Sequence, residues 1–242
     1  MRKVYFVMVL PLGYRHDLLK KFFLDRTFAK RSFLKTLTDP DIKVKLIAEI
    51  KKSSPSKGVM LKPDENIVDI SKLYRLNGAS CLSLVTEESF FNGSVWDVKR
   101  VKEAMTMPVL RKDFIVDEYQ LYESKYFKSD CVLLIAGILN EEELKRFSGL
   151  ARDLEMDTLF EVHNKEDLDK AMKCNPEIVG VNNRDLATFE VDLKRSEQLI
   201  PDIPSGILRV SESGIKNYND ILYLKNLGAD AFLVGETIIF AQ

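Results

Sequence analysis

The feature that most constrains the fold is a regular alternation of short apolar runs and longer amphipathic stretches, which begins at Lys45. The amphipathic stretches, such as 67–76, 95–105, 118–127, 141–154 and 218–227, space their apolar residues as one face of a helix does. The apolar runs have the length of buried strands. There are eight: KLIAEI (45–50), CLSLVT (81–86), PVLRKD (108–113), CVLLIA (131–136), DTLFEV (157–162), IVGVNN (178–183), ILRVSES (207–213) and AFLVGE (231–236).

Alternating strands and helices imply a parallel sheet, and eight such units in 242 residues predict an α/β fold of the (β/α)8 TIM-barrel type. A doubly wound open sheet is the competing architecture, but no G-x-G-x-x-G turn follows the first run. We therefore expect a single TIM-barrel domain over 1–242, with an N-terminal extension at 1–44 and the barrel at 45–242.

The two ends of the chain are less regular. Arg2, Lys3 and the apolar residues 4–12 imitate the start of a signal peptide, but no small-residue cleavage site follows, and the run is shorter than the ~20 residues of a membrane span. Residues 17–37 show the spacing of one or two amphipathic helices. Only five residues follow Thr237, so we expect the eighth helix to be missing or replaced, and residues 4–12 to cover the flank that it leaves.

Composition narrows the class of function. Thirty-six basic and 37 acidic residues give a net charge of −1, which provides no general attraction to nucleic acid or to an anionic membrane. Three widely spaced cysteines indicate neither a disulfide framework nor a zinc site and favour the cytoplasm, and two histidines are too few for a histidine-rich metal centre.

A barrel of this type carries its reactive groups at the carboxyl ends of the strands. Glu49 and Lys51 lie two residues apart after the first run, so they project from the same face, although a solvated ion pair at a strand end would have the same spacing. Charged or amide residues follow most of the other runs, which indicates a reactive site: Thr86, Glu87, Lys112, Glu161, Asn182, Arg184, Glu212 and Ser213.

Two glycines follow the last two runs. Gly214 and Gly235 lie in the pair of loops where such barrels commonly bind phosphate through backbone N–H groups, although ordinary turn glycines would also fit. Glu236, beside the second glycine, is compatible with an anion only if its carboxylate turns away. We predict a phosphate site in these loops.

The residues also carry a resemblance to a known family. The segments IAEIKKSSPSKG, LVTEESFFNG, PVLRKDFIVDEYQ, LLIAGIL, LFEVHNKEDLD, VGVNNRDLATFEVD, VSESGI and FLVGE resemble those of the indole-3-glycerol phosphate synthases, the barrel lyases of tryptophan biosynthesis. The resemblance spans Ile47 to Glu236 and implies closure of 1-(2-carboxyphenylamino)-1-deoxyribulose 5-phosphate to indole-3-glycerol phosphate, with loss of carbon dioxide and water and without a metal or organic cofactor.

The resemblance also implies roles for particular residues. Lys112 would be the acid that protonates the keto oxygen, acting as a buried lysine held near other cations. The acid and base of the dehydration would be found among Lys51, Glu161 and Glu49, and Lys51 could equally hold the substrate carboxylate. The remaining site residues would orient or bind the substrate: Asn182, Arg184, Glu212 and Ser213 around the reacting groups, Phe91 and Phe114 around the aromatic ring with Leu233 deeper in the barrel, Ser54 closing the first loop over the phosphate, and Gly214, Gly235 and Glu236 at the phosphate itself. His163 follows Glu161 by two residues, but we leave it out of the predicted site as an incidental loop histidine.

Two alternatives remain at the level of sequence. A phosphoribosylanthranilate isomerase-like barrel would keep the phosphate loops, but it uses a Cys/Asp pair, and no cysteine stands at a suitable strand end here. A non-catalytic barrel subunit would not need Lys51, Lys112 and Glu161 together. The expected partner is a small phosphorylated molecule; the sequence leaves a homodimer or a fusion with other pathway enzymes open.

Overall fold

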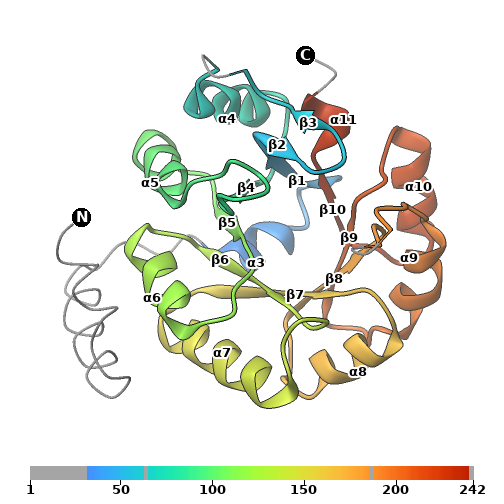
Figure 1. Ribbon diagram of the computed structural model, residues 1–242. Coiled ribbons are helices and arrows are strands. Elements are labelled where there is room, and N and C mark those ends of the chain that lie inside the picture. Colours follow the sequence, from blue (N-terminus) through green and yellow to red (C-terminus); the bar gives the residue numbers. More distant parts are fainter. Residues whose placement is uncertain (1–31, 63–64, 186–187, 240–242) are drawn as a thin grey trace, which may run out of the picture.

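The computed structural model describes residues 32–62, 65–185 and 188–239, and its central feature is a closed barrel of eight parallel strands (Figure 1). The order around the barrel is β1-β10-β9-β8-β7-β6-β5-β4, so strands that follow one another in the chain are neighbours and the last pairs with the first. The predicted TIM barrel is confirmed. The strands are β1 (Lys45–Ile50), β4 (Cys81–Val85), β5 (Val109–Lys112), β6 (Cys131–Ile135), β7 (Asp157–Val162), β8 (Ile178–Asn182), β9 (Leu208–Glu212) and β10 (Ala231–Val234).

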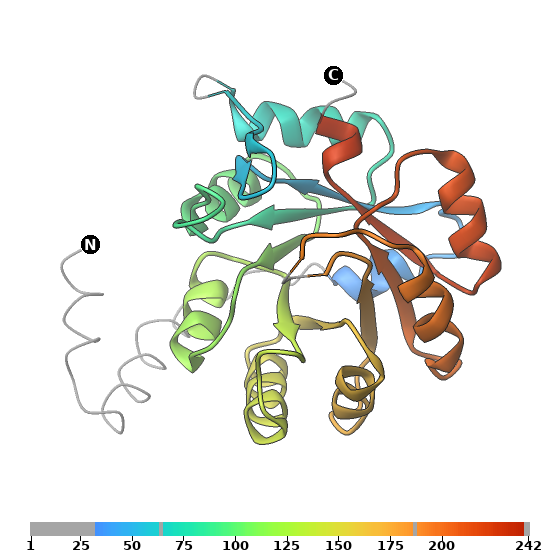
Figure 2. The same cartoon turned by 45° about the vertical axis from the view of Figure 1, so that its right-hand side comes forward.

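Helices form the outer ring, as the view in Figure 2 shows, and several begin with a strong cap. Asp117, Asn140 and Asn217 each form a capping box with the side chain three residues further on, which satisfies backbone N–H groups at the helix start. The helices of the ring are α4 (Ile67–Leu76), α5 (Val95–Ala104), α6 (Glu118–Tyr126), α7 (Glu141–Asp153), α8 (Lys165–Met172), α9 (Lys194–Leu199) with the 3-10 turn η1 (Ile200–Asp202), and α10 (Tyr218–Asn226). None of the helices in the described ranges is long and apolar enough to cross a membrane.

A short helix, α3 (Phe33–Leu37), closes the amino-terminal end of the barrel. Phe33 and Leu37 are fully buried among apolar side chains of the barrel interior, including Cys81 and Cys131. The backbone N–H of Leu34 donates to the carboxylate of Asp157 at the start of β7 (3.0 Å), which fixes the helix against the strands. Helix α3 lies within the helical extension that the apolar spacing predicts; residues 1–31, including 4–12, lie outside the described ranges.

The flank between β10 and β1 carries one turn of helix. Helix α11 (Glu236–Ile239) begins two residues after β10, and Ile239 is buried against Ala48 and Ile50 of β1. Among the described residues, the single turn of α11 occupies the position of the eighth helix, which we expected to be missing or replaced.

The opposite end of the barrel opens into the site. There a small hairpin of β2 (Ser53–Ser54) and β3 (Gly58–Val59) follows β1. The N–H of Met60 donates to the carbonyl of Lys52 (2.8 Å), and that of Ser53 to the carbonyl of Phe91 (3.1 Å), so the hairpin is tied to the loop after β4. The barrel thus places a closed base beneath the site and an ordered loop beside it.

Candidate active site

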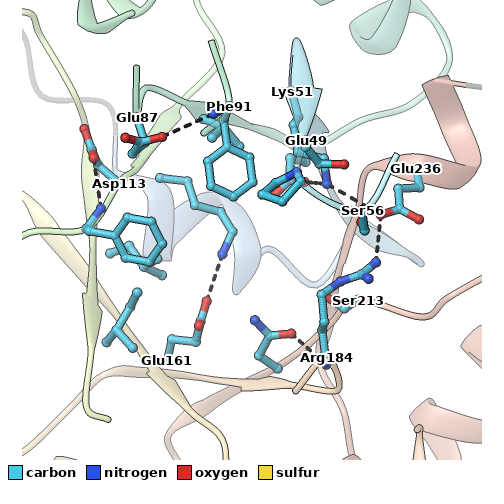
Figure 3. Close-up of a pocket in the computed structure, with 18 of the residues that line it drawn as sticks. Glu49, Lys51, Ser56, Glu87, Phe91, Asp113, Glu161, Arg184, Ser213 and Glu236 are labelled. Carbon is cyan, nitrogen blue, oxygen red and sulfur yellow. Dashed lines mark hydrogen bonds and ion pairs between the residues drawn. The ribbon is translucent and has the colours of Figure 1, made fainter. Parts of the chain in front are cut away.

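A pocket lies at the carboxyl ends of the strands, where the barrel fold places reactive groups (Figure 3). Side chains from β1, β5 and β7 reach it from different sides of the barrel, among them Glu49, Lys112 and Glu161. Residues at and after the strand ends contribute to the rest of the wall: Lys51, Ser54, Glu87, Phe91, Asp113, Phe114, Asn182, Arg184, Phe189, Ser213 and Glu236. The structure therefore brings most of the predicted site residues into one pocket.

Lys112 is the central cation of the pocket. Its Nζ donates to Glu161 Oε2 at 2.8 Å and to Glu212 Oε2 at 3.3 Å. Both carboxylates are 1% exposed, and Glu212 lies beneath Lys112 without lining the pocket. We expected Lys112 to be held near other cations; the charges that the described residues place against it are those of carboxylates, because Glu161 and Glu212 reach the same layer of the barrel.

These contacts and the burial of the groups raise the pKa of Lys112 and of Glu212 and lower the pKa of Glu161. Burial disfavours the charged Lys112, but Glu161, Glu212 and Glu49 outweigh burial and raise its pKa. Burial raises the pKa of Glu212, and Glu161 adds to this, whereas for Glu161 the attraction of Lys112 and of His163 overcomes burial and lowers the pKa. The pocket therefore holds a protonated lysine beside an ionised Glu161.

A second ionic group lies at the end of β1. Lys51 Nζ is 3.2 Å from Glu49 Oε1, so the two side chains share a face as their spacing predicts. Glu236 does not turn away from the site as expected: its Oε1 accepts a hydrogen bond from Arg184 Nη2 (2.7 Å) and lies 3.8 Å from Lys51 Nζ. One carboxylate thus bridges two cations that are available to a substrate anion.

Two glycines make room for the carboxylates of neighbouring strands. A Cβ on Gly180 would lie 2.1 Å from Glu212 Oε1, and a Cβ on Gly235 would lie 2.7 Å from Glu49 Oε1. Nonbonded carbon and oxygen atoms do not approach so closely, so any larger residue at Gly180 or Gly235 would displace the Glu212 or Glu49 side chain. Gly235 therefore leaves room for the Glu49 carboxylate, in addition to its predicted place in a phosphate-binding loop.

A smaller cavity lies beside the pocket, between the loops after β9 and β10. Ser213 (φ 65°) and Gly214 (φ 80°) turn the first loop through the left-handed region, and Gly235 begins the second. Lys51, Arg184 and Glu236 line both this cavity and the main pocket, and Lys216 lines the cavity. The predicted phosphate loops therefore share their cations with the pocket.

Two more of the predicted residues lie on different sides of the site. Leu233, expected deeper in the barrel than the two rings, is buried in the barrel interior and lines the cavity between the glycine loops, whereas Val85, Leu133 and Ile135 line the main pocket. Leu233 lies on β10, which is separated by β1 from β4, the strand before the Phe91 loop. Ser54 is among the residues that line the main pocket and not among those that line the cavity between the glycine loops, and its hydroxyl accepts from the N–H of Lys57 within the hairpin.

The apolar wall consists of Phe91 and Phe114, whose ring centroids are 6.4 Å apart with a tilt of 46°. Glu87 orders the first of these loops, because its carboxylate accepts from the N–H groups of Ser89, Phe90 and Phe91. The 6.4 Å separation of the Phe91 and Phe114 rings suits a flat aromatic group packed beside them. Glu87 is a residue whose role the sequence did not assign.

Support behind Lys112 comes from a buried polar network. Arg111 points away from the pocket and donates to Asp113 Oδ2 (2.9 Å) and to Thr86 Oγ1 (3.2 Å). Thr86 in turn donates to Asp113 (2.6 Å). On β8, Asn182 lines the pocket, and its Oδ1 accepts from the N–H of Arg184 (3.0 Å). These contacts fix the strand ends that carry Lys112 and Arg184.

His163 was left out of the predicted site, and it does not line the pocket, but it contacts Glu161, which does. Its Nε2 lies 3.2 Å from Glu161 Oε1, on the side of the carboxylate opposite Lys112. The two-residue spacing that groups Glu49 with Lys51 also groups Glu161 with His163, so the signal was present in the sequence.

Fold and pocket together define a (β/α)8-barrel enzyme in which titratable side chains and two glycine-containing loops meet at the carboxyl ends of the strands. Among solved structures, an N-acetylmannosamine-6-phosphate 2-epimerase from Clostridium perfringens is similar in fold, with a TM-score of 0.64 at 14% identity over 88% of this chain and 93% of that one. A tryptophan synthase alpha-subunit from Pyrococcus furiosus gives 0.61 at 16% identity, over 81% and 89% of the two chains.

Sequence comparison identifies the family. Residues 15–242 match the family model of indole-3-glycerol phosphate synthase. An indole-3-glycerol phosphate synthase from Caldanaerobacter subterraneus subsp. tengcongensis is 48% identical over 81% of this chain and 76% of its own length. Another, from Campylobacter jejuni subsp. doylei, is 42% identical over 91% and 85%. The chain belongs to the indole-3-glycerol phosphate synthase family.

Proposed function

We propose that the pocket around Lys112 converts 1-(2-carboxyphenylamino)-1-deoxyribulose 5-phosphate to indole-3-glycerol phosphate, carbon dioxide and water. The chain is a carboxy-lyase of tryptophan biosynthesis by its family. The observation that carries the residue assignment is the placement of Lys112 between two buried carboxylates, in a pocket that has an aromatic wall at one side and anion-binding loops at the other.

The three parts of the substrate match three parts of the site. The phosphate binds between the glycine loops, where the N–H groups of Gly214, Ile215, Gly235 and Glu236 donate to no described residue. The anthranilate ring packs beside Phe91 and Phe114. Lys51 and Arg184, which line both cavities, bind the negative groups between these two ends.

Ring closure uses the proton of Lys112. As the aromatic carbon attacks the keto carbon, the keto oxygen becomes an alkoxide, a much stronger base than a lysine amine. Lys112 therefore transfers its proton to that oxygen even though its own pKa is raised. The bond to the carboxylate then breaks, carbon dioxide leaves, and its electron pair restores the aromatic ring.

Dehydration uses the remaining groups. Lys51, held by Glu49, protonates the departing hydroxyl, which leaves as water. Glu161 takes a proton from the ring carbon between the nitrogen and the hydroxyl-bearing carbon, and the C–H electron pair forms the new ring double bond as the hydroxyl leaves. Glu161 is able to accept this proton because its pKa rises once Lys112 has become neutral. That proton returns to Lys112 across the 2.8 Å contact. Lys112 and Lys51 each give one proton to the substrate, and one proton returns to Lys112, so the enzyme takes one proton from solvent per turnover. This uptake balances the conversion of the negatively charged carboxylate to neutral carbon dioxide.

The test is an assay of the purified chain with the carboxyphenylamino substrate, following indole fluorescence and proton uptake. We expect one proton consumed per indole formed. A parallel assay with phosphoribosylanthranilate covers the isomerase alternative, and activity with that substrate alone would refute the proposal. Absence of turnover with both would favour a non-catalytic barrel.

We place the reaction in the cytoplasm and leave the oligomeric state open. The support for the location is the chemistry of the cysteines: Cys81, Cys131 and Cys174 are all buried free thiols. Burial raises the pKa of Cys174, and more strongly those of the other two, so each is held as an unreactive thiol.

A further inference from the structure

Five side chains of alternating charge run through the site from β9 to α8. They are Glu212, Lys112, Glu161, His163 and Asp167, and successive groups are separated by 3.3, 2.8, 3.2 and 3.8 Å. Lys112 and Glu161 line the pocket, whereas His163 and Asp167 stand behind it. The proposed mechanism moves protons through Lys112 and Glu161, with Glu212 only pairing with Lys112, and it gives no role to His163 or Asp167.

Strand geometry explains why His163 reaches Glu161. Side chains two apart in a strand share a face, so His163 follows Glu161 on the inward side where β7 ends at Val162. Lys112 occupies Oε2 of Glu161, and His163 Nε2 faces Oε1. Nε2 is buried and makes no well-aligned hydrogen bond within the described ranges, and Glu161 Oε1, at 3.2 Å, is the ion-pair partner that it faces.

Asp167 holds the imidazole from behind. It lies in the first turn of α8, where its N–H donates to the capping Asn164 (2.8 Å) and its Oδ2 accepts from the N–H of His163 (3.1 Å). The same oxygen lies 3.8 Å from His163 Nδ1. Because Asp167 is buried and doubly anchored, the ring is fixed between two carboxylates.

We propose that His163, held by Asp167, is a positioning residue that orients Glu161 and keeps it ionised as the base of the dehydration. This deepens the proposed function and rests on it. The charges facing the pair are Lys112 on Glu161, Glu212 beyond Lys112, and Asp167 with Lys170 behind His163. Burial opposes a charged imidazole, but the contacts with Asp167 and Glu161 outweigh burial and raise the pKa of His163 to about 9.

The imidazole can be observed directly, because the chain has only two histidines. In a His16→Gln background a single imidazole remains, and its pKa can be measured by NMR without substrate. Glu161→Gln should lower that pKa from about 9 toward the ~6.5 of a free imidazole. An unchanged pKa would overturn the proposal, whether or not the chain proves to be a synthase.

The catalytic consequence is tested by His163→Gln. Loss of the imidazolium raises the pKa of Glu161, so the acid limb of kcat should move to higher pH and kcat at pH 7 should fall roughly three- to tenfold, with KM unchanged. Asp167→Asn should move the limb in the same direction by less. Lys165→Gln on the same helix is the matched control, since Lys165 is 58% exposed and pairs with Asp169 and Asp202.

These results separate the possible failures. An active His163→Gln enzyme with an unshifted acid limb and unchanged kcat would show that His163 has no part in positioning Glu161. A shift in Lys165→Gln equal to that in His163→Gln would overturn the proposal as well, because the effect would then belong to net charge. If Glu161→Gln fails to fold, Asp167→Asn decides the NMR experiment: it should also lower the pKa of His163, and an unchanged value would count against the proposal.

Discussion

Replacing Lys112 by methionine removes the cation between two buried carboxylates and keeps most of the side-chain volume. Its Nζ lies 2.8 Å from Glu161 and 3.3 Å from Glu212, which are each 1% exposed. Removing one partner of a buried ion pair costs about 3–5 kcal/mol, because the other charge stays buried. For a chain of 242 residues, each kcal/mol lowers Tm by about 2–4 °C, so we expect a fall of about 6–20 °C at pH 8.

The fall in Tm caused by Lys112→Met should depend on pH. Without Lys112 the carboxyl groups of Glu161 and Glu212 have higher pKa values in the folded variant than in the folded wild type. An acid whose folded pKa is raised stabilises the fold at low pH and loses that contribution as pH rises through the folded pKa. In the wild type the pKa of Glu161 is lowered, so its contribution is present above the ordinary carboxyl pKa and is lost as pH falls. The Tm difference between the two proteins should therefore narrow from pH 8 to pH 5.

Activity and stability can be separated with a control. Lys112→Met should lower kcat by at least the ~10²–10⁴-fold typical of a lost general acid. Lys102 forms a buried pair with Asp130 and does not line the pocket, so Lys102→Met should lower Tm while the folded fraction keeps its kcat. Thermal melts from pH 5 to 8 and indole fluorescence give the two readouts. More than a tenth of wild-type kcat in Lys112→Met would remove it as the acid, and a Tm difference independent of pH would show that the carboxylates do not depend on it.

Three further predictions concern the same site. Glu161→Gln should cripple turnover and keep substrate affinity, because an amide fills the space without accepting the proton; a change in KM alone would make Glu161 a binding residue. Glu236→Ser should free Arg184 of a 2.7 Å carboxylate and tighten inhibition by inorganic phosphate about fivefold, for a released interaction of about 1 kcal/mol; weaker inhibition would show that Glu236 helps to bind the anion. Gly235→Ala should raise KM and lower kcat together, because the new Cβ would displace Glu49; unchanged inhibition by phosphate would place the anion elsewhere.

Much of the fold could be predicted because it depends on local patterns. The eight apolar runs agree with the observed strands to within two residues at each end, and the helices α4, α5, α6, α7 and α10 were predicted as closely. The small hairpin after β1 was not predicted, since its strands have two residues each and carry no periodic signal. The four-residue α11 is likewise too short for a helical period.

The candidate site was likewise predictable from sequence in some features and not in others. Spacing alone placed Glu49 with Lys51 on one face, and the fold rule placed reactive groups at the strand ends. The directions of two other side chains were not predicted. The Glu236 carboxylate was expected to turn away and instead pairs with Arg184, and His163 was set aside as incidental but contacts Glu161. Each of these depends on which neighbour a side chain meets after the barrel closes.

The sequence by itself therefore determined the alternation that builds the barrel and the face on which each strand-end residue lies, because both follow from backbone periodicity. Only the tertiary structure decided which charges meet. Lys112 is 49 residues from Glu161 and 100 from Glu212, and barrel closure brings all three within hydrogen-bonding distance. Coulomb energies depend on distance and burial in space, so the protonation state of Lys112, Glu161 and Glu212 is a property of the closed barrel and of none of its strands alone.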